Sequence, residues 1–128
     1  MNTQAQRAFE ALEYLRAVTN RPRLETQQIS LLLGLYSLPT EGVTMQDLAK
    51  EVAGVTQSFI SRNASAFGVN SKPGAERMLG LRIGEDVRYR TVHFLEAGRK
   101  IMDTFIGILD GSQRPPKGMR PAVDRRTK

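Results

Sequence analysis

The chain of 128 residues contains no cysteine, a single histidine and no long apolar run. Without cysteine it can form no disulfide, no thiol-based redox sensor and no cysteine-ligated zinc site. No window approaches the roughly 18 consecutive apolar residues of a transmembrane helix. Residues 1–16 also lack the apolar stretch of a secretion signal. We therefore expect a cytoplasmic protein without a membrane partner.

The sequence offers few groups for catalysis or metal binding. The single histidine, His93, lies between Val92 and Phe94 in a strand-like run, and no second ligand or catalytic partner accompanies it. A surface or packing histidine is the simpler interpretation. Gly80 and Gly84 are spaced for a hairpin rather than for a phosphate-binding loop, and the five methionines lie too far apart to form a cofactor site. We expect no enzymatic activity, no catalytic residue, no metal and no cofactor.

The basic charge is distributed unevenly along the chain. The net charge is +6, but residues 111–128 hold six basic residues and one acidic residue, which gives +5 there and only +1 for residues 1–110. This segment also has three prolines and few apolar residues, which predicts a disordered tail. Such a tail either attracts phosphates without sequence preference or serves only to increase solubility.

The most informative stretch begins at Thr44 with two short helices predicted around a tight turn. The Thr44 hydroxyl can cap the first helix by accepting a hydrogen bond from the backbone N–H of Asp47. Gly54 can form the turn because a positive φ costs glycine little. We expect the small side chains of Ala49 and Ala53 to allow the two helices to cross closely.

The second helix is expected to start with Thr56 as its cap and to continue to about Phe67. Ile60, Ala64 and Phe67 recur at helical spacing and predict a buried side. The other side is polar and suits the major groove, where Arg can bond guanine, Gln can bond adenine, and Ser suits phosphates or base edges. A solvated polar face is the alternative interpretation. The candidate DNA-binding residues of this helix are Thr56, Gln57, Ser58, Ser61, Arg62 and Ser65.

A hairpin is predicted behind these helices. Its strands are residues 79–83 and 87–94, which are rich in β-branched and apolar side chains, and residues 84–86 have turn chemistry. Arg88 and Arg90 would share one face near the tip, where a basic hairpin can contact phosphates or the minor groove. The alternative is an ordinary solvated hairpin.

Three further helices are predicted around this core, over residues 2–18, 26–37 and 96–109. The whole is a mainly α, α+β fold in one domain of residues 1–110, with a DNA-binding core at 26–95 and the basic tail at 111–128. We expect that the compact core cannot cover the apolar stripes of both end helices and that a second copy does so, although a monomer with folded-back end helices is the alternative. The predicted dimerisation residues are Phe9, Leu12, Leu15, Ile101, Phe105 and Ile108.

The ordered set of motifs resembles the MarR-type family of bacterial transcription regulators. That family shares a run close to T-x-x-x-L-A and Q-S-x-V-S-R, an Asp-x-Arg tip in a β-hairpin wing, and E-x-G-R at the start of the following helix. The residues that carry the resemblance here are Thr44, Leu48-Ala49, Gln57-Ser58, Ile60-Ser61-Arg62, Asp86-Val87-Arg88 and Glu96-Ala97-Gly98-Arg99. This chain has one residue more in the turn, the long connector VNSKPGAER after Gly68, and Leu95 in place of a capping threonine.

The resemblance implies a winged helix-turn-helix that binds double-stranded DNA as a homodimer. It implies that Gln57, Ser58, Ser61 and Arg62 lie on the recognition helix, that Arg88 enters the minor groove, and that Asp86 supports the wing by orienting an arginine. An inverted-repeat operator with half-sites about 10 bp apart would match the dimer, most simply for a repressor. Family members often respond to a small ligand. A pocket for one would be lined by Phe9, Leu12, Tyr36 and Phe105, but plain core is the favoured interpretation of these residues.

A different class of function fits the same fold. Winged helices also dock on polymerases and other proteins without reading bases, so a protein-interaction module is the alternative. Binding of single-stranded nucleic acid is less favoured, because Tyr89 is the only aromatic residue near the basic tip and no stacking platform is evident.

Overall fold

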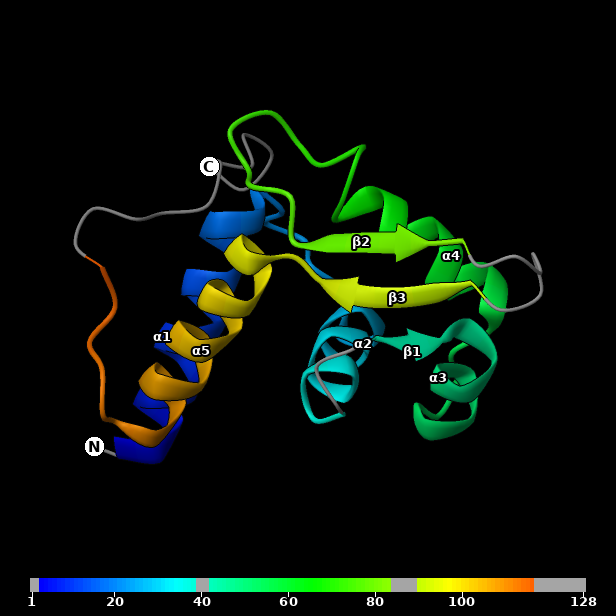
Figure 1. The fold of residues 1–128 in the computed structure, drawn as a ribbon. Coiled ribbons are helices and arrows are strands. Elements are labelled where there is room, and N and C mark those ends of the chain that lie inside the picture. Colours follow the sequence, from blue (N-terminus) through cyan, green and yellow to red (C-terminus); the bar gives the residue numbers. More distant parts are fainter. Residues whose placement is uncertain (1–2, 39–41, 84–89, 117–128) are drawn as a thin grey trace.

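The computed structural model describes residues 3–38, 42–83 and 90–116. These residues form five helices and one three-stranded antiparallel sheet, an α+β arrangement (Figure 1). The elements in chain order are α1 (Thr3–Thr19), α2 (Thr26–Tyr36), β1 (Val43–Thr44), α3 (Met45–Glu51), α4 (Gln57–Ala66), β2 (Leu79–Arg82), β3 (Thr91–Phe94) and α5 (Glu96–Asp110).

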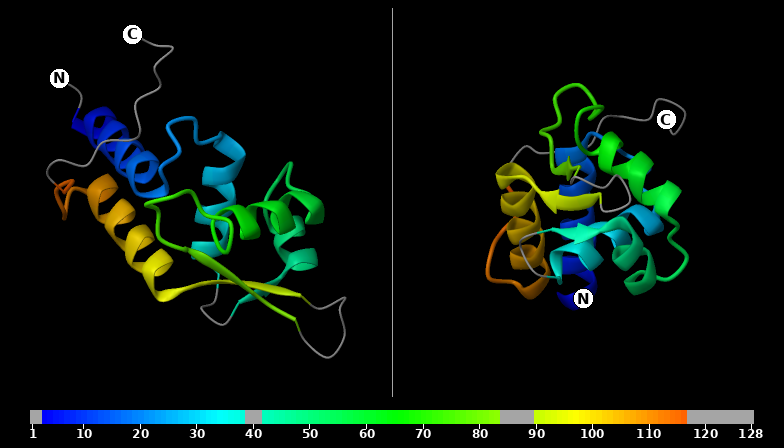
Figure 2. Two further views of the ribbon diagram at one scale, coloured as in Figure 1. Left: turned by 90° about the horizontal axis from the view of Figure 1, so that it is seen from above. Right: turned by 45° about the vertical axis from the view of Figure 1, so that its right-hand side comes forward.

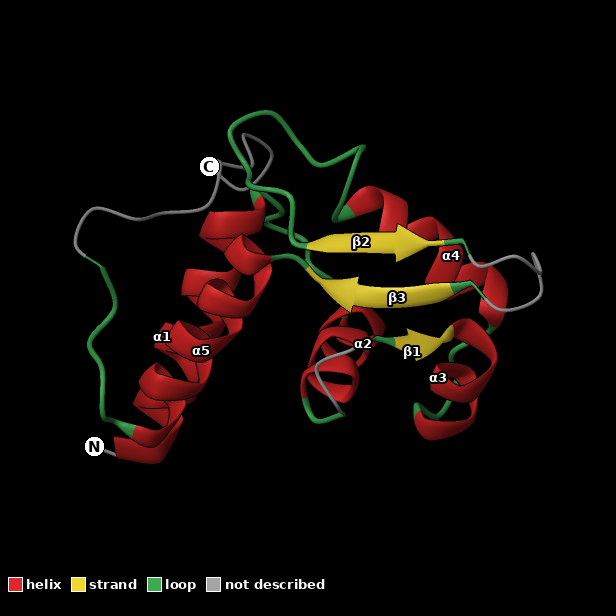
Figure 3. Cartoon of the chain, viewed as in Figure 1, coloured by secondary structure: helices red, strands yellow, loops and turns green. Residues whose placement is uncertain are grey.

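The sheet joins the predicted hairpin to a strand that the sequence did not reveal. Its order is β1-β3-β2, and Val92 of β3 lies opposite Val43 on one side and Leu81 on the other (Figure 3). The β2–β3 pairing confirms the hairpin, whereas its turn at residues 84–86 lies outside the described residues. The strand β1 was missed because two residues are too short to give an alternating pattern.

The predicted caps and turn of the two short helices are confirmed. The Thr44 hydroxyl accepts from the Asp47 N–H at 3.1 Å, and the Thr56 hydroxyl accepts from the Phe59 N–H at 3.0 Å. Gly54 has a φ of +76° in the turn between α3 and α4. The prediction for Ala53 is wrong. Helix α3 ends at Glu51, so Ala53 lies in the turn and is exposed rather than at a helix crossing.

The two end helices cover most of each other's apolar stripes within one chain, whereas the sequence analysis expected a second copy to cover them. Helices α1 and α5 run antiparallel and side by side, and α5 also contacts α2 and β3 of the unit formed by the sheet and α2 to α4 (Figures 1 and 2). Their facing stripes are buried within one chain: Leu15, Ile101, Phe105 and Ile108 are each at most 7% exposed. Of the predicted dimerisation residues, only Phe9, at 58% exposed, and half-buried Leu12 remain accessible.

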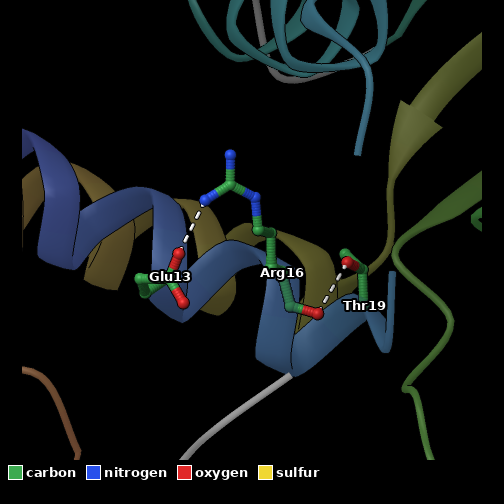
Figure 4. A network of polar contacts seen from close by, with 3 residues as sticks. All are labelled: Glu13, Arg16 and Thr19. Atoms are coloured by element: carbon green, nitrogen blue, oxygen red, sulfur yellow. Dashed lines mark hydrogen bonds and ion pairs between the residues drawn. The ribbon is translucent and has the colours of Figure 1, made fainter. Parts of the chain in front are cut away.

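Polar contacts close the C-terminal end of α1. Arg16 Nη1 contacts Glu13 Oε1 at 2.7 Å, and the Thr19 hydroxyl donates to the backbone carbonyl of Arg16 at 3.4 Å (Figure 4). The same hydroxyl donates to the backbone carbonyl of Leu15 at 2.7 Å. Asn20 follows with a φ of +51°, a left-handed conformation that asparagine tolerates and that ends the helix. Helix α1 therefore ends at Thr19, one residue beyond the predicted end.

Candidate nucleic-acid interface

The exposed face of α4 carries part of the predicted polar set. Gln57, Ser58 and Arg62 are exposed, whereas Ser61 and Ser65 are half-buried. The Ser65 hydroxyl oxygen accepts a hydrogen bond of 2.6 Å from Asn70 Nδ2, so part of its bonding capacity is already used within the chain. The Thr56 hydroxyl caps the helix. The three exposed side chains are therefore the ones free to contact a partner; we call them the α4 polar face.

Arg62 is the charged member of the α4 polar face. Its Nε donates to the backbone carbonyl of Ser58 at 3.4 Å, a long contact within the same helix. Among the described residues no carboxylate forms an ion pair with Arg62. A guanidinium group in this state presents two free amino groups and a full positive charge to a planar acceptor such as guanine or a phosphate.

Two more arginines lie at the hairpin end of the sheet. Arg82 ends β2 opposite Thr91, and Arg90 precedes β3; both are exposed. The backbone carbonyl of Arg90 accepts from the Met45 N–H at 3.0 Å, which ties this end of the hairpin to the start of α3. Arg82 was not predicted as a site residue. Its position two residues before the predicted turn at 84–86 could have identified it as a basic residue near the hairpin tip. The predicted residues Asp86 and Arg88 lie outside the described residues.

A buried asparagine fixes the back of α4. Asn63 is 7% exposed; its Nδ2 donates to the Phe59 carbonyl at 2.9 Å, and its Oδ1 accepts from Gln28 Nε2 of α2 at 2.9 Å. Because both groups of the amide are paired, burying this polar side chain costs little free energy. The hydrogen bond to Gln28 also fixes the rotation of α4 about its axis relative to α2. Sequence reasoning missed this contact, since a polar residue on an otherwise apolar stripe gives no sign of its partner.

The C-terminal end of α4 is held by the loop between α1 and α2. Arg21 Nη2 donates to the Ala66 carbonyl at 3.2 Å, and its guanidinium carbon lies 5.1 Å from the centroid of the Phe67 ring. A cation suits this position because unpaired carbonyls gather at a helix C-terminus. Asn20 Nδ2 also donates to the Pro73 carbonyl at 3.0 Å, so the long connector after α4 rests on the same loop.

A second polar cluster joins the unit of the sheet to the end helices. The Tyr36 hydroxyl of α2 hydrogen-bonds Asp103 of α5, and this bond raises the pKa of Tyr36. The Arg99 guanidinium lies 5.7 Å from the ring centroids of both Tyr36 and Phe94. Tyr36 therefore packs on α5, and Phe105 is buried, as expected for core residues, whereas Phe9 is 58% exposed and does not belong to the core.

His93 is a packing residue of the sheet, as the sequence suggested. Its ring covers Gly80 on β2, where an added Cβ would lie 2.9 Å from Nε2, and its Nδ1 is buried without a hydrogen-bond partner. Burial lowers the pKa of His93, and the nearby positive charge of Arg82 lowers it further. The described residues contain no group of three or more acidic, histidine or cysteine side chains suited to a metal ion.

Comparisons of this chain with models of protein families, with curated proteins and with solved structures found no match. Its class is therefore given by its own elements: an α+β fold in which five helices accompany a small antiparallel sheet within the described ranges. In that same part of the chain, every helix is too short or too polar to cross a bilayer.

Proposed function

We propose that this chain is a winged helix-turn-helix protein that binds double-stranded DNA through α4 and the β2–β3 hairpin. More particularly, we propose a MarR-like transcription regulator that acts as a homodimer on an inverted repeat, most simply as a repressor. The order α2, β1, α3, α4, β2, β3 supports the class, because it gives a capped helix pair followed by a hairpin. The motif resemblance supports the particular family.

The α4 polar face carries the proposal. Arg62 has no ion pair among the described residues, and Gln57 and Ser58 lie exposed beside it, while Asn63 holds the opposite side of the helix against α2. A helix fixed from behind, with unpaired polar groups in front, is preorganised to place donors and acceptors against base edges. Arg82 and Arg90 add positive charge at the adjacent end of the sheet, where phosphates would lie.

Selection of bound sequences from random duplex DNA, with residues 117–128 removed, tests the proposal. We expect recovery of an inverted repeat, and an affinity that falls steeply as the salt concentration rises. Arg62→Ala should weaken binding by about 1–3 kcal/mol. Lys100→Ala is the matched control, because it removes one exposed positive charge from α5 and should have little effect. Equal weakening by both variants would show that only net charge matters and would contradict the proposal.

Exposed apolar residues on an edge strand favour one other function. Leu81 of β2 and Ile83, which follows the strand, are 39% and 66% exposed, and β2 is an edge of the sheet. An extended peptide can add to such an edge, which would make the fold a protein-interaction module. Ile83→Lys separates the two functions: it should abolish peptide addition, while the added positive charge should preserve or strengthen the binding of duplex DNA.

A further inference from the structure

A groove of about 340 Å³ lies between the two end helices and the connector that follows α4. We call it the connector groove; its lining residues are Tyr14, Ala17, Val18, Gly74, Glu76, Ile101 and Pro116. Its volume falls in the range of small-molecule sites. The long connector supplies one wall, and the segment after α5 turns back along the helix pair and supplies Pro116 (Figure 1).

The walls of the connector groove are preformed by internal hydrogen bonds. Asn20 holds the connector through the Pro73 carbonyl at 3.0 Å, and the Ala75 N–H donates to the Lys72 carbonyl at 3.0 Å. On the opposite side, Tyr14 and Ile101 are each 7% exposed and belong to the packed α1–α5 pair. Binding of a ligand therefore requires little additional ordering of the protein.

The lining of the groove combines apolar and polar surface with one negatively charged side chain. Ala17, Val18 and Ile101 are hydrocarbon, and Glu76 is the one charged residue among the lining residues. Within the described part of the chain Glu76 forms no ion pair. Burial raises the pKa of the Tyr14 hydroxyl, a hydrogen bond with Thr104 lowers it, and the Glu76 carboxylate raises it, so the phenol stays neutral at physiological pH.

We propose that the connector groove binds a small amphiphilic cation, such as an aromatic amine. Its apolar body would lie against Ala17, Val18 and Ile101, and its ammonium group would lie beside the Glu76 carboxylate. An anion of the same size meets no positive lining group and is repelled by Glu76. This site does not depend on DNA binding.

Two probes that share one ring system and differ in charge test the site on the full chain. Tryptamine carries an ammonium group, whereas indole-3-propionate carries a carboxylate on a side chain of similar length. Titration calorimetry should show that tryptamine binds more tightly than indole-3-propionate. Glu76→Gln should weaken the binding of tryptamine about two- to fivefold, because an exposed charge pair changes an affinity only a few-fold. The affinities for the two probes should then become similar. Glu51→Gln, an exposed carboxylate on α3, is the matched control and should change neither affinity.

Methyl resonances locate the bound probe without any variant. Tryptamine should shift the methyl signals of Ala17, Val18 and Ile101 and leave those of Val43 and Leu48 unchanged. Ala17→Phe should fill part of the connector groove and abolish binding of both probes. If this variant does not fold, the methyl shifts of the parent protein test the location of the site. The proposal is overturned if the two probes bind equally, if Glu76→Gln leaves tryptamine unaffected, or if the shifts lie elsewhere.

Discussion

The α1–α5 pair and helix α4 are both amphipathic and both bury their apolar sides, but they differ in what covers that side and in what the polar side offers to a partner. The pair turns its apolar stripes inward on each other, and within one chain Leu15 and Phe105 lose nearly all contact with water. Helix α4 also buries Ile60 and Ala64, but its polar side is left exposed with an arginine that has no ion pair among the described residues. Helical periodicity identifies which face is apolar, whereas only the tertiary arrangement shows what covers it.

The largest effect should come from the buried side of the α1–α5 pair. Phe105→Ala should lower the free energy of unfolding by about 3–5 kcal/mol, because it removes a buried ring and leaves a cavity. Phe9→Ala makes the same change on the exposed side of α1 and should cost less than about 0.5 kcal/mol in the monomer. Urea unfolding followed by circular dichroism measures both. Similar losses in the two variants would mean that Phe9 is also covered within the chain.

The next effect should come from the contact that fixes α4. Asn63→Ala removes a buried amide that makes two hydrogen bonds and leaves the Gln28 amide without this partner, which should cost about 1–3 kcal/mol of stability. Ser58→Ala, on the exposed side of the same helix, should stay within about 0.5 kcal/mol. If the proposed function holds, Asn63→Ala should also weaken duplex binding at temperatures where it is fully folded. A double-mutant cycle with Gln28→Ala should show coupling between the two residues.

A smaller effect should come from the histidine of the sheet. The folded state lowers the pKa of His93, so the unfolded chain takes up the proton first as the pH falls. Stability should therefore be full above the ordinary histidine pKa of about 6.5 and decline as the pH falls below it towards the lower pKa of the folded state. Denaturant midpoints at pH 7.5 and 5.5 measure this change. Because the chain has one histidine, His93→Gln should remove most of it.

The smallest effect on folding, and the most direct on assembly, concerns the outer side of α1. If two copies associate through the accessible residues Phe9 and Leu12, Phe9→Ala should shift the monomer–dimer equilibrium towards monomer while the unfolding midpoint extrapolated to low concentration stays the same. Analytical ultracentrifugation over a range of concentrations gives the dissociation constant. An unchanged dissociation constant would show that the dimer contact does not involve this side of α1.

Local signals in the sequence predicted much of the secondary structure. Thr44, Thr56 and Gly54 act through neighbours three residues away or through their own φ, so the sequence contains the whole interaction. The hairpin and the buried side of α4 follow from periodicity in the same way. The main local failures were the end of α3 at Glu51 and the two-residue strand β1, whereas the other missed contacts join residues far apart in the chain.

The non-local contacts could not be predicted from these patterns. The pairing of Asn63 with Gln28 joins residues 35 positions apart, and Arg21 reaches Ala66 over 45 positions. Neither pair has a periodic or motif signal. The same limit explains the end helices: their stripes were recognised, but the pattern does not distinguish coverage by a second copy from coverage by the other end of the same chain.

The pairing of α1 with α5 also determines when α1 can complete its packing during synthesis. Leu15 leaves the ribosome about 90 residues before Phe105, so the apolar side of α1 has no partner while the middle of the chain is being made. At about 5–20 residues per second, that interval lasts several seconds or more. During this time α1 must remain solvated, pack elsewhere or be held by a chaperone. The last helix to be made therefore completes the fold of the first, and a chain that stops before α5 leaves the apolar side of α1 exposed.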